Sequence, residues 1–266
     1  MKPFERPIGV FDSGLGGLTV FRALAHAMPQ EDLIYFGDTA HVPYGSKSKE
    51  AVTRYSVAVA RFLASRRVKA LVVACNTSSA LALPAIEKAV DVPVIGVVAA
   101  GAAAAAKAAV RRRVGVIGTE ATIRSGAYQA ALKRRLPRVS VTAAACPLFV
   151  PLVEEGWWDD AVTTEVAHRY LAPLRGAKPD VLILGCTHYP LLKPVIQKVM
   201  GSSVALIDSA EETARQTKWV LAERNLRRLK GKGQHKFYVS DSPGTFVKLS
   251  QRFLGTTVRN VELKEL

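Results

Sequence analysis

The apolar stretch ALVVACNTSS at residues 70–79 returns in similar form as VLILGCTHYP at residues 181–190. A second pair stands ahead of it in each half of the chain, because IGVFDSG at residues 8–14 resembles VGVIGTE at residues 114–120. Each stretch is a short apolar run that ends in small polar residues, which is typical of a buried strand followed by a helix. Such units resemble one another in all α/β proteins, but both pairs keep their order and nearly the same separation. We therefore interpret the chain as two similar α/β halves.

Short runs rich in Val and Ile alternate along the chain with longer segments of helical spacing. The runs predict strands at residues 8–11, 33–36, 70–74, 92–97, 114–117, 139–144, 181–184, 204–207 and 237–239. The longer segments predict helices at residues 49–65, 101–110, 127–136, 163–171 and 210–225. Strands that alternate with helices form parallel sheets, and continuous apolar strands suit such sheets because helices cover both faces. The expected fold class is α/β, with two pseudo-symmetric domains of mostly parallel sheet flanked by helices.

The boundary between the halves is expected near residues 97–101, where the chain passes from the first repeat to the second. Helix and strand signals continue after residue 208 to the end, but that segment is too short for a third domain. We therefore expect it to join the first half. The expected domains are residues 1–98 plus 209–266 and residues 99–208.

The composition is typical of a globular chain with a sizeable core. The chain has 266 residues, of which 49% are hydrophobic, and a formal net charge of +15. These values exclude a disordered chain, a collagen-like repeat and a disulfide scaffold, and no apolar run is long enough to span a membrane. Glu5, Arg6 and Pro7 stand where a secretory signal needs apolar residues, so we expect a cytoplasmic protein with no membrane contact.

The sequence has no pattern typical of a metal or cofactor site. Its three cysteines, Cys75, Cys146 and Cys186, form no CxxC pair, and no histidine cluster joins them at ligand spacing. The glycine-rich stretch DSGLGG at residues 12–17 lacks the third glycine of the dinucleotide fingerprint. It is better explained as a tight turn whose backbone approaches a small anion. We expect no metal and no cofactor.

Polar residues end several of the predicted strands. Ligands of open α/β sheets bind beyond the carboxyl ends of the strands, which makes these residues candidates for a site. They are Asp12, Ser13, Asp38, Thr39, Cys75, Asn76, Thr77, Thr119, Cys186, Thr187 and His188. Asp, Ser, Thr and Asn also cap helices, and for Asp38 or Thr119 alone capping is the simpler interpretation.

Two of the cysteines call for a chemical explanation. A cysteine usually behaves as a small buried hydrophobic residue, and we adopt this interpretation for Cys146. Cys75 and Cys186 instead stand just before predicted helices, where a helix N-terminus favours the thiolate. Two such thiols in facing halves predict two bases on opposite sides of one carbon. One base would remove a proton from one face and the other would return a proton to the opposite face.

Three titratable residues could assist these thiols. Asp12 ends the first strand of the half that carries Cys75. His188 follows Cys186 by two residues, and Glu154 could point inward in the second half. General acid–base assistance contributes about 10²–10⁴-fold, which is too little for an amino-acid α-proton, so fixed dipoles must supply the rest.

Six stretches together resemble one known family. They are FDSGLGGLTV, YFGDTAHVPYG, VVACNTSSA, GTEATIRSGAY, CPLFVPLVEEG and LGCTHYPLL, which lie between about residues 8 and 217. As a set they resemble bacterial glutamate racemases. The resemblance implies interconversion of L- and D-glutamate without cofactor or metal, and supply of D-glutamate to peptidoglycan. It also implies a homodimer whose subunits each have the active site at the interface between two domains.

The resemblance assigns roles to individual residues. It implies that Cys75 and Cys186 donate and accept the proton. It implies further that Asp12 assists Cys75, and that Glu154 and His188 assist Cys186. The substrate-binding residues that it implies are Asp12, Ser13, Pro43, Tyr44, Gly45, Asn76, Thr77, Thr119, Thr122, Thr187 and His188. One departure from the family pattern is His41, where arginine is expected.

Two alternatives concern the chemistry of the site. A sibling racemase that acts on aspartate would share the paired cysteines, although the triplet Cys186-Thr187-His188 resembles the glutamate branch. An amino-acid-binding module without catalysis would keep Asn76, Thr77 and Thr187 but would not need the thiols.

A third alternative, a nucleic-acid binder, is suggested by the positive charge. The densest basic patch consists of Arg224, Arg227, Arg228, Lys230 and Lys232. No motif of a nucleic-acid-binding module accompanies this patch. We therefore expect a solvated surface with at most salt-sensitive, non-specific binding, and no specific nucleic-acid partner.

Overall fold

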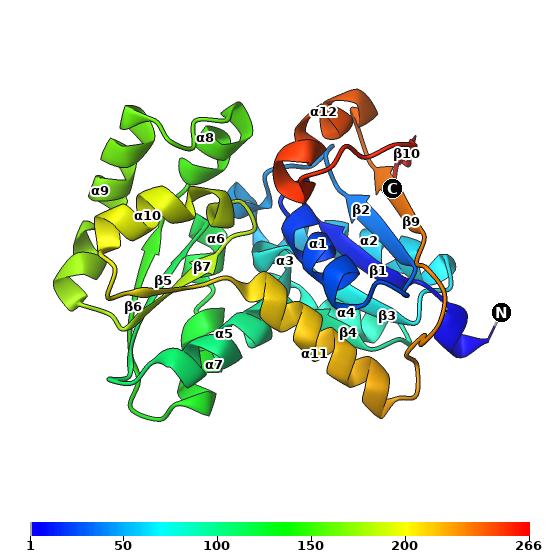
Figure 1. The fold of residues 1–266 in the computed structure, drawn as a ribbon, viewed down its shortest axis with the longest axis horizontal. Coiled ribbons are helices and arrows are strands. Elements are labelled where there is room, and N and C mark those ends of the chain that lie inside the picture. The colour runs from blue at the N-terminus through cyan, green and yellow to red at the C-terminus, as the bar shows by residue number, and fades with distance from the viewer. Residues whose placement is uncertain (1) are drawn as a thin grey trace.

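Two parallel sheets form the framework of the computed structural model, which describes residues 2–266 (Figure 1). The first sheet has the strand order β10-β9-β2-β1-β3-β4, and the second has the order β6-β5-β7-β8. The first sheet consists of β1 (Ile8–Asp12), β2 (Leu33–Gly37), β3 (Ala70–Val73), β4 (Val94–Gly96), β9 (His235–Val239) and β10 (Val261–Leu263). The second consists of β5 (Arg113–Gly118), β6 (Ser140–Ala145), β7 (Val181–Gly185) and β8 (Ala205–Ile207). The predicted α/β fold class is confirmed.

Helices connect the strands and cover the sheets (Figure 1). In chain order they are α1 (Leu18–Ala27), α2 (Lys49–Ser65), α3 (Asn76–Leu81), α4 (Leu83–Ala89), α5 (Val97–Ala108), α6 (Glu120–Arg124), α7 (Ala127–Arg135), α8 (Phe149–Glu155), α9 (Ala161–Ala177), α10 (Lys193–Met200), α11 (Ser209–Glu223) and α12 (Pro243–Leu254). Short 3₁₀ turns lie at Pro3–Glu5, Tyr44–Ser46 and Tyr189–Leu192. The helix predicted at residues 49–65 has the bounds of α2, which begins after the N-cap Ser48.

The two sheets repeat one topology. Four adjacent strands of the first sheet, β2-β1-β3-β4, have the same order as the strands of the second, β6-β5-β7-β8. This correspondence pairs β1 with β5 and β3 with β7, which are the strands of the two repeats found in the sequence. The prediction of two similar α/β halves is therefore confirmed at the level of strand order.

Some predicted elements differ from the observed ones for local physical reasons. The strand predicted at residues 92–97 ends at Gly96, and α5 begins at once at Val97 rather than at residue 101. The helix predicted at residues 163–171 continues to Ala177 through Pro173. Proline removes a hydrogen bond to the carbonyl four residues earlier, and that carbonyl belongs to Arg169, an exposed residue of the helix. The sequence prediction named neither β10 nor the helices α1, α3, α4, α6, α8, α10 and α12.

The sheet pairing brings the ends of the repeat strands together. β1 lies beside β3 in the first sheet, with Phe11 opposite Val73, so Asp12 and Cys75 come to one edge. β5 lies beside β7 in the second sheet, with Gly118 opposite Gly185, so Thr119 and Cys186 share an edge in the same way. Parallel pairing thus places polar residues from distant parts of each half at a common sheet edge.

The chain segment after residue 208 returns to the first sheet. Its strands β9 and β10 extend that sheet beyond β2, and α11 packs against both α1 and α5. In Figure 1 this segment, drawn in orange and red, lies against the blue elements of the N-terminal part. The exact domain division, residues 1–98 plus 209–266 and residues 99–208, stays a prediction.

Two kinds of feature are missing from residues 2–266. No helix in this range is long and apolar enough to cross a lipid bilayer. No three His, Cys, Asp or Glu side chains in this range are gathered as the ligands of a metal ion would be.

A buried ion pair joins separate segments of the first sheet. Lys69, just before β3, pairs with Glu31, just before β2, and both side chains are 1% exposed. Lys69 Nζ also donates to the carbonyl oxygen of Phe4 at 2.7 Å, and Glu31 accepts from the backbone N of Arg228 at 2.9 Å. The pair thus ties the N-terminal turn and the segment after α11 to the central strands.

We expect Lys69→Met to lower the free energy of unfolding by about 3–5 kcal/mol, because Glu31 is then buried without its cation. Urea unfolding followed by far-UV circular dichroism measures this change. Arg169→Met removes a cation from the exposed pair with Glu165 and is the matched control, expected to cost less than about 1 kcal/mol. Equal losses in the two variants would contradict the structural role of the buried pair.

Candidate active site

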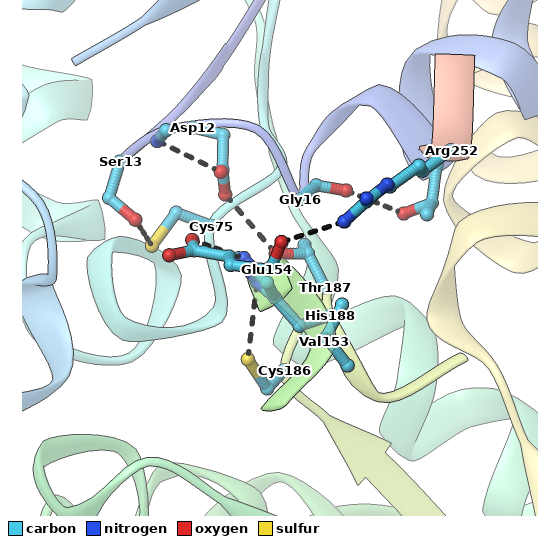
Figure 2. Close-up of polar contacts among 12 residues, drawn as sticks. Asp12, Ser13, Gly16, Cys75, Val153, Glu154, Cys186, Thr187, His188 and Arg252 are labelled. Atoms are coloured by element: carbon cyan, nitrogen blue, oxygen red, sulfur yellow. Dashed lines mark hydrogen bonds and ion pairs between the residues drawn. The ribbon is translucent and has the colours of Figure 1, made fainter. Parts of the chain in front are cut away.

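Cys75 lies at the carboxyl end of β3, where the chain turns directly into α3. Its backbone is extended, and as the N-cap of α3 its sulfur accepts a hydrogen bond from Ser78 N at 3.5 Å. The thiol in turn donates to Ser13 Oγ, 3.6 Å away in the turn after β1 (Figure 2). The first repeat therefore delivers its cysteine beside the end of β1, as the parallel pairing predicts.

Burial controls the protonation of Cys75. It raises the pKa of the thiol to about 11, the negative charge of Asp12 adds to the rise, and the hydrogen bonds with Ser78 and Ser13 oppose it. The expectation that the helix start after Cys75 lowers the pKa of its thiol is therefore wrong. The expected helix start after Cys186 is also wrong, because β7 is followed by a turn and the 3₁₀ residues Tyr189–Leu192. Burial also raises the pKa of Asp12, and the charge on His188 limits that rise. Cys75 thus keeps its proton at neutral pH.

Cys186 has a different electrostatic environment. Its sulfur lies 3.9 Å from His188 Nδ1, and the other ring nitrogen, Nε2, lies 2.9 Å from Glu154 Oε1 (Figure 2). Burial alone lowers the pKa of His188, but the hydrogen bonds with Cys186 and Glu154 and the charges of these partners raise it to about 10. His188 is therefore an imidazolium at neutral pH. The electrostatic surroundings of the two thiols therefore differ, with the carboxylate of Asp12 near Cys75 and the imidazolium of His188 beside Cys186.

Both cysteines line a single cavity of about 30 Å³. This volume is close to the share of one water molecule in liquid water, so a larger ligand requires the walls to move apart. The lining contains every predicted substrate-binding residue except Asp12 and Thr122. Two apolar residues that were not predicted, Val42 and Val150, complete it. The predicted residues therefore include most of the polar lining of the cavity but not its apolar residues, Val42 and Val150.

The predicted residues that do not line the cavity lie directly behind it. Asp12 accepts a hydrogen bond from Thr187 Oγ1 at 3.5 Å. Thr122 Oγ1 lies 3.2 Å from Thr77 Oγ1. Glu154 reaches the cavity through His188. Each of these side chains therefore orients a lining residue.

Hydrogen bonds join the two halves of the molecule at the wall of the cavity. Thr77 from the first repeat lies 3.0 Å from Thr119 Oγ1 of the second, and Tyr128 OH donates to Asn76 Oδ1 at 2.6 Å. Within the described residues, Asn76 Nδ2 is a buried side-chain nitrogen without a partner. Because Asn76 also lines the cavity, this amide group is available to donate a hydrogen bond to a ligand.

Asp38 and Thr119, both interpreted as simple helix caps, behave differently. Thr119 is indeed the N-cap of α6, and its side chain also lines the cavity. The buried carboxylate of Asp38 caps no helix, so that interpretation is wrong. It accepts hydrogen bonds from Tyr44 OH and, at 2.7 Å, from Ser240 Oγ, and it lies 2.9 Å from His41 Nδ1. Asp38 therefore holds Tyr44, a cavity residue, against the C-terminal end of β9.

The remaining sequence candidates lie away from the cavity. Cys146 is fully buried in the hydrophobic core, as its interpretation as a packing residue requires. Of the basic patch, Arg228 forms an ion pair with Asp32 at 2.9 Å, and none of its five residues lines the cavity. The expectation of at most non-specific nucleic-acid binding stays a prediction.

The family model described as Asp/Glu/Hydantoin racemase matches residues 8–217. This chain belongs to that family. The chain is 54% identical to a glutamate racemase from Geobacter metallireducens, over 96% of this chain and 95% of the relative. The fold is similar to that of Francisella tularensis glutamate racemase in complex with D-glutamate, with a TM-score of 0.94, 38% identity and 98% of each chain covered.

Membership in this racemase family makes the chain an enzyme of the isomerase class. An aspartate racemase homologue from Pyrococcus horikoshii, with a TM-score of 0.58 and 19% identity, covers 82% of this chain and 99% of its own. At that identity the likeness concerns the fold alone.

The charge on His188 predicts a pH dependence of stability in this racemase. The pKa of His188 in the folded protein is about 10, above the ordinary value of 6.5. The protonated ring therefore stabilises the folded protein fully below pH 6.5, and this stabilisation is lost as the pH rises toward the folded-state pKa. The raised pKa of Cys75 changes the pH dependence of stability only above the ordinary thiol pKa of 9.0. We therefore expect the free energy of unfolding in urea to fall between about pH 7 and 8.5 because of His188.

Glu154→Gln removes a charge that raises this pKa, so the fall should become shallower over the same pH interval. Glu155→Gln alters the exposed neighbouring carboxylate and should leave the slope unchanged. A slope in Glu154→Gln as steep as in the wild type would contradict the coupling between Glu154 and His188.

Proposed function

We propose that this racemase interconverts L- and D-glutamate through two thiol bases, Cys75 and Cys186, without a cofactor. The observation that carries the proposal is that two cysteines from equivalent strand ends, β3 and β7, line the same small cavity. Removing a proton from one face of a carbon and returning one to the opposite face requires bases on both sides. Two thiols brought from facing halves of a repeated fold meet this requirement.

The reaction starts with one sulfur as thiolate and the other as thiol. The thiolate takes the α-proton, and the electron pair of the C–H bond stays on the α-carbon and its carboxylate. The opposite thiol then donates its proton to the other face, and its S–H electron pair stays on sulfur. The site ends with the two protonation states exchanged, so the reverse reaction uses the same groups in the reverse order.

The different surroundings of the two sulfurs fit this exchange. Burial raises the pKa of Cys75 to about 11 and so keeps its proton in place at neutral pH. When Cys186 acts as the base, Cys75 is therefore ready to donate the proton to the opposite face. Proton uptake by Cys186 takes place beside the imidazolium of His188, 3.9 Å away. In the other direction Cys75 is the base, and Asp12, whose own pKa is raised by burial, stands near it.

The lining residues support an amino-acid substrate with a second carboxylate. Asn76 Nδ2 has no partner in the described residues and is a ready donor to a carboxylate oxygen. The hydroxyls of Thr77 and Thr187 line the same cavity, while Val42 and Val150 form an apolar wall suited to methylene groups. The named substrate of the Geobacter relative and the D-glutamate in the Francisella structure support glutamate as this substrate.

Substrate entry requires the two halves to separate, since the cavity of about 30 Å³ is too small for an amino acid. We propose that the contacts Thr77–Thr119 and Thr187–Asp12 break on opening and return on closure. Supply of D-glutamate for peptidoglycan, a cytoplasmic location and a homodimer follow from the family resemblance and stay predictions.

Proton NMR of L-glutamate in D₂O, with purified protein and nothing added, tests the proposal. We expect the α-proton signal to disappear as deuterium enters from the solvent, and the optical rotation to fall to zero as the D-isomer forms. L-Aspartate under the same conditions should keep its α-proton. Turnover of aspartate with none of glutamate would contradict the substrate assignment.

Cys75→Ser and Cys186→Ser provide the controls for the two-base step. A serine hydroxyl is far less acidic than a thiol, so each variant should fold but lose inversion of glutamate. Cys146→Ser, which alters the packing cysteine, should retain inversion. Unchanged turnover in either active-site variant would refute the assignment of two thiol bases.

A further inference from the structure

Helix α12 reaches from the C-terminal part of the chain to the Cys186 side of the site. Its flanking strands, β9 and β10, belong to the first sheet. However, Arg252 Nη1 donates a hydrogen bond to the backbone oxygen of Glu154 at 2.8 Å (Figure 2). The next residue, Phe253, packs edge-on against the ring of His188, with centroids 5.4 Å apart. Two consecutive residues of α12 thus contact the backbone of Glu154 and the ring of His188, which lies beside Cys186.

The guanidinium of Arg252 fits the end of α8. Glu154 is in the last turn of α8, where backbone carbonyls lack partners within the helix. Trp158 Nε1 donates to the oxygen of Val153 at 2.9 Å, and the guanidinium lies 5.9 Å from the centre of the Trp158 ring. Gly156, with φ +86°, ends the helix, and a Cβ there would lie 2.9 Å from Arg252 Nη1. Arg252 and Trp158 therefore hold the helix end that carries Glu154.

A continuous series of contacts leads from Arg252 to Cys186. Glu154 Oε1 lies 2.9 Å from His188 Nε2, and His188 Nδ1 lies 3.9 Å from the sulfur of Cys186. The side chain of Glu154 is 33% exposed, so water competes for its carboxylate unless the backbone is held. The polar partners of Cys75 are Ser13 and Ser78, which lie outside this series.

We propose that Arg252 is a positioning residue for the Cys186 half of the reaction. It holds the end of α8 so that Glu154 stays on His188 and His188 stays beside Cys186, and it leaves the Cys75 half unaffected. This inference rests on the proposed function, since it takes Cys186 as one of the two bases. Because a displacement of about 1 Å in a reacting group can cost up to about a hundredfold in rate, the effect should be measurable.

Racemisation rates alone do not isolate one half of the reaction. L- and D-glutamate have the same free energy, so their equilibrium constant is one and kcat/KM must be equal in both directions for every variant. A reaction that needs only one base is therefore required. Loss of HCl from 3-chloroglutamate is such a reaction, and each configuration at the α-carbon presents its proton to one sulfur.

The elimination is balanced without the second thiol. A thiolate takes the α-proton, the C–H electron pair forms a C=C bond, and chloride leaves with the C–Cl electron pair. Water then hydrolyses the enamine to 2-oxoglutarate and ammonium. Cys75→Ser and Cys186→Ser calibrate the assay, because each should abolish elimination from one configuration and leave the other. The calibration shows which configuration reports on Cys186.

In Arg252→Met, which keeps the aliphatic stem, we expect 2-oxoglutarate formation from the Cys186-dependent configuration to fall about tenfold or more in kcat. The rate from the other configuration should stay within about twofold of the wild type, and this unaffected rate is an internal test of folding. Arg252→Lys, which keeps one donor, should restore part of the lost rate. Lys248→Met removes an exposed cation from the same helix and should change neither rate.

Equal losses for both configurations, or no loss for either, would overturn the positioning role. If the two cysteine variants fail to select opposite configurations, or if the wild type does not racemise glutamate, the proposed function fails and this inference fails with it. If the two cysteine variants select opposite configurations but Arg252→Met changes elimination from both configurations equally, only the role of Arg252 is refuted.

Discussion

The burial of two thiols in one cavity is the constraint on which the rest of the structure depends. Each thiol stands where a central strand of a parallel sheet ends, and the repeated strand order brings β3 and β7 to equivalent places. Hydrogen bonds such as Thr77–Thr119 and Tyr128–Asn76 join the two halves beside this cavity. The fold thus places two sulfurs around a space of about 30 Å³.

A repeated fold does not give the two sulfurs the same environment. Cys75 is buried near the carboxylate of Asp12, whereas Cys186 lies beside an imidazolium that Glu154 stabilises. A racemase must nevertheless treat two mirror-image substrates with equal kcat/KM, because its equilibrium constant is one. The two sulfurs therefore have unlike neighbours although the reaction is thermodynamically symmetric. Arg252, which donates a hydrogen bond to the backbone oxygen of Glu154, is the distant residue that we propose acts on the Cys186 half alone.

Local sequence patterns were sufficient for most strands, for the repeat and for the polar strand ends of the cavity, whereas Pro43, Tyr44 and Gly45 were expected only from the family resemblance. The residues at strand ends could be identified because parallel pairing places them at one edge whatever the rest of the chain does. The helix through Pro173 and the pKa of Cys75 could not be predicted, since the exposure of one helix face and the burial of one thiol depend on packing. The contact of Arg252 with Glu154 joins residues far apart in the chain, and no local pattern indicates it.

A crystal structure with glutamate bound in the closed site tests the central claim most directly. The account predicts that the sulfurs of Cys75 and Cys186 lie on opposite faces of the α-carbon, each within about 4 Å of it. Both sulfurs on the same face, or one of them screened from the α-carbon by another part of the protein, would contradict inversion by two thiols.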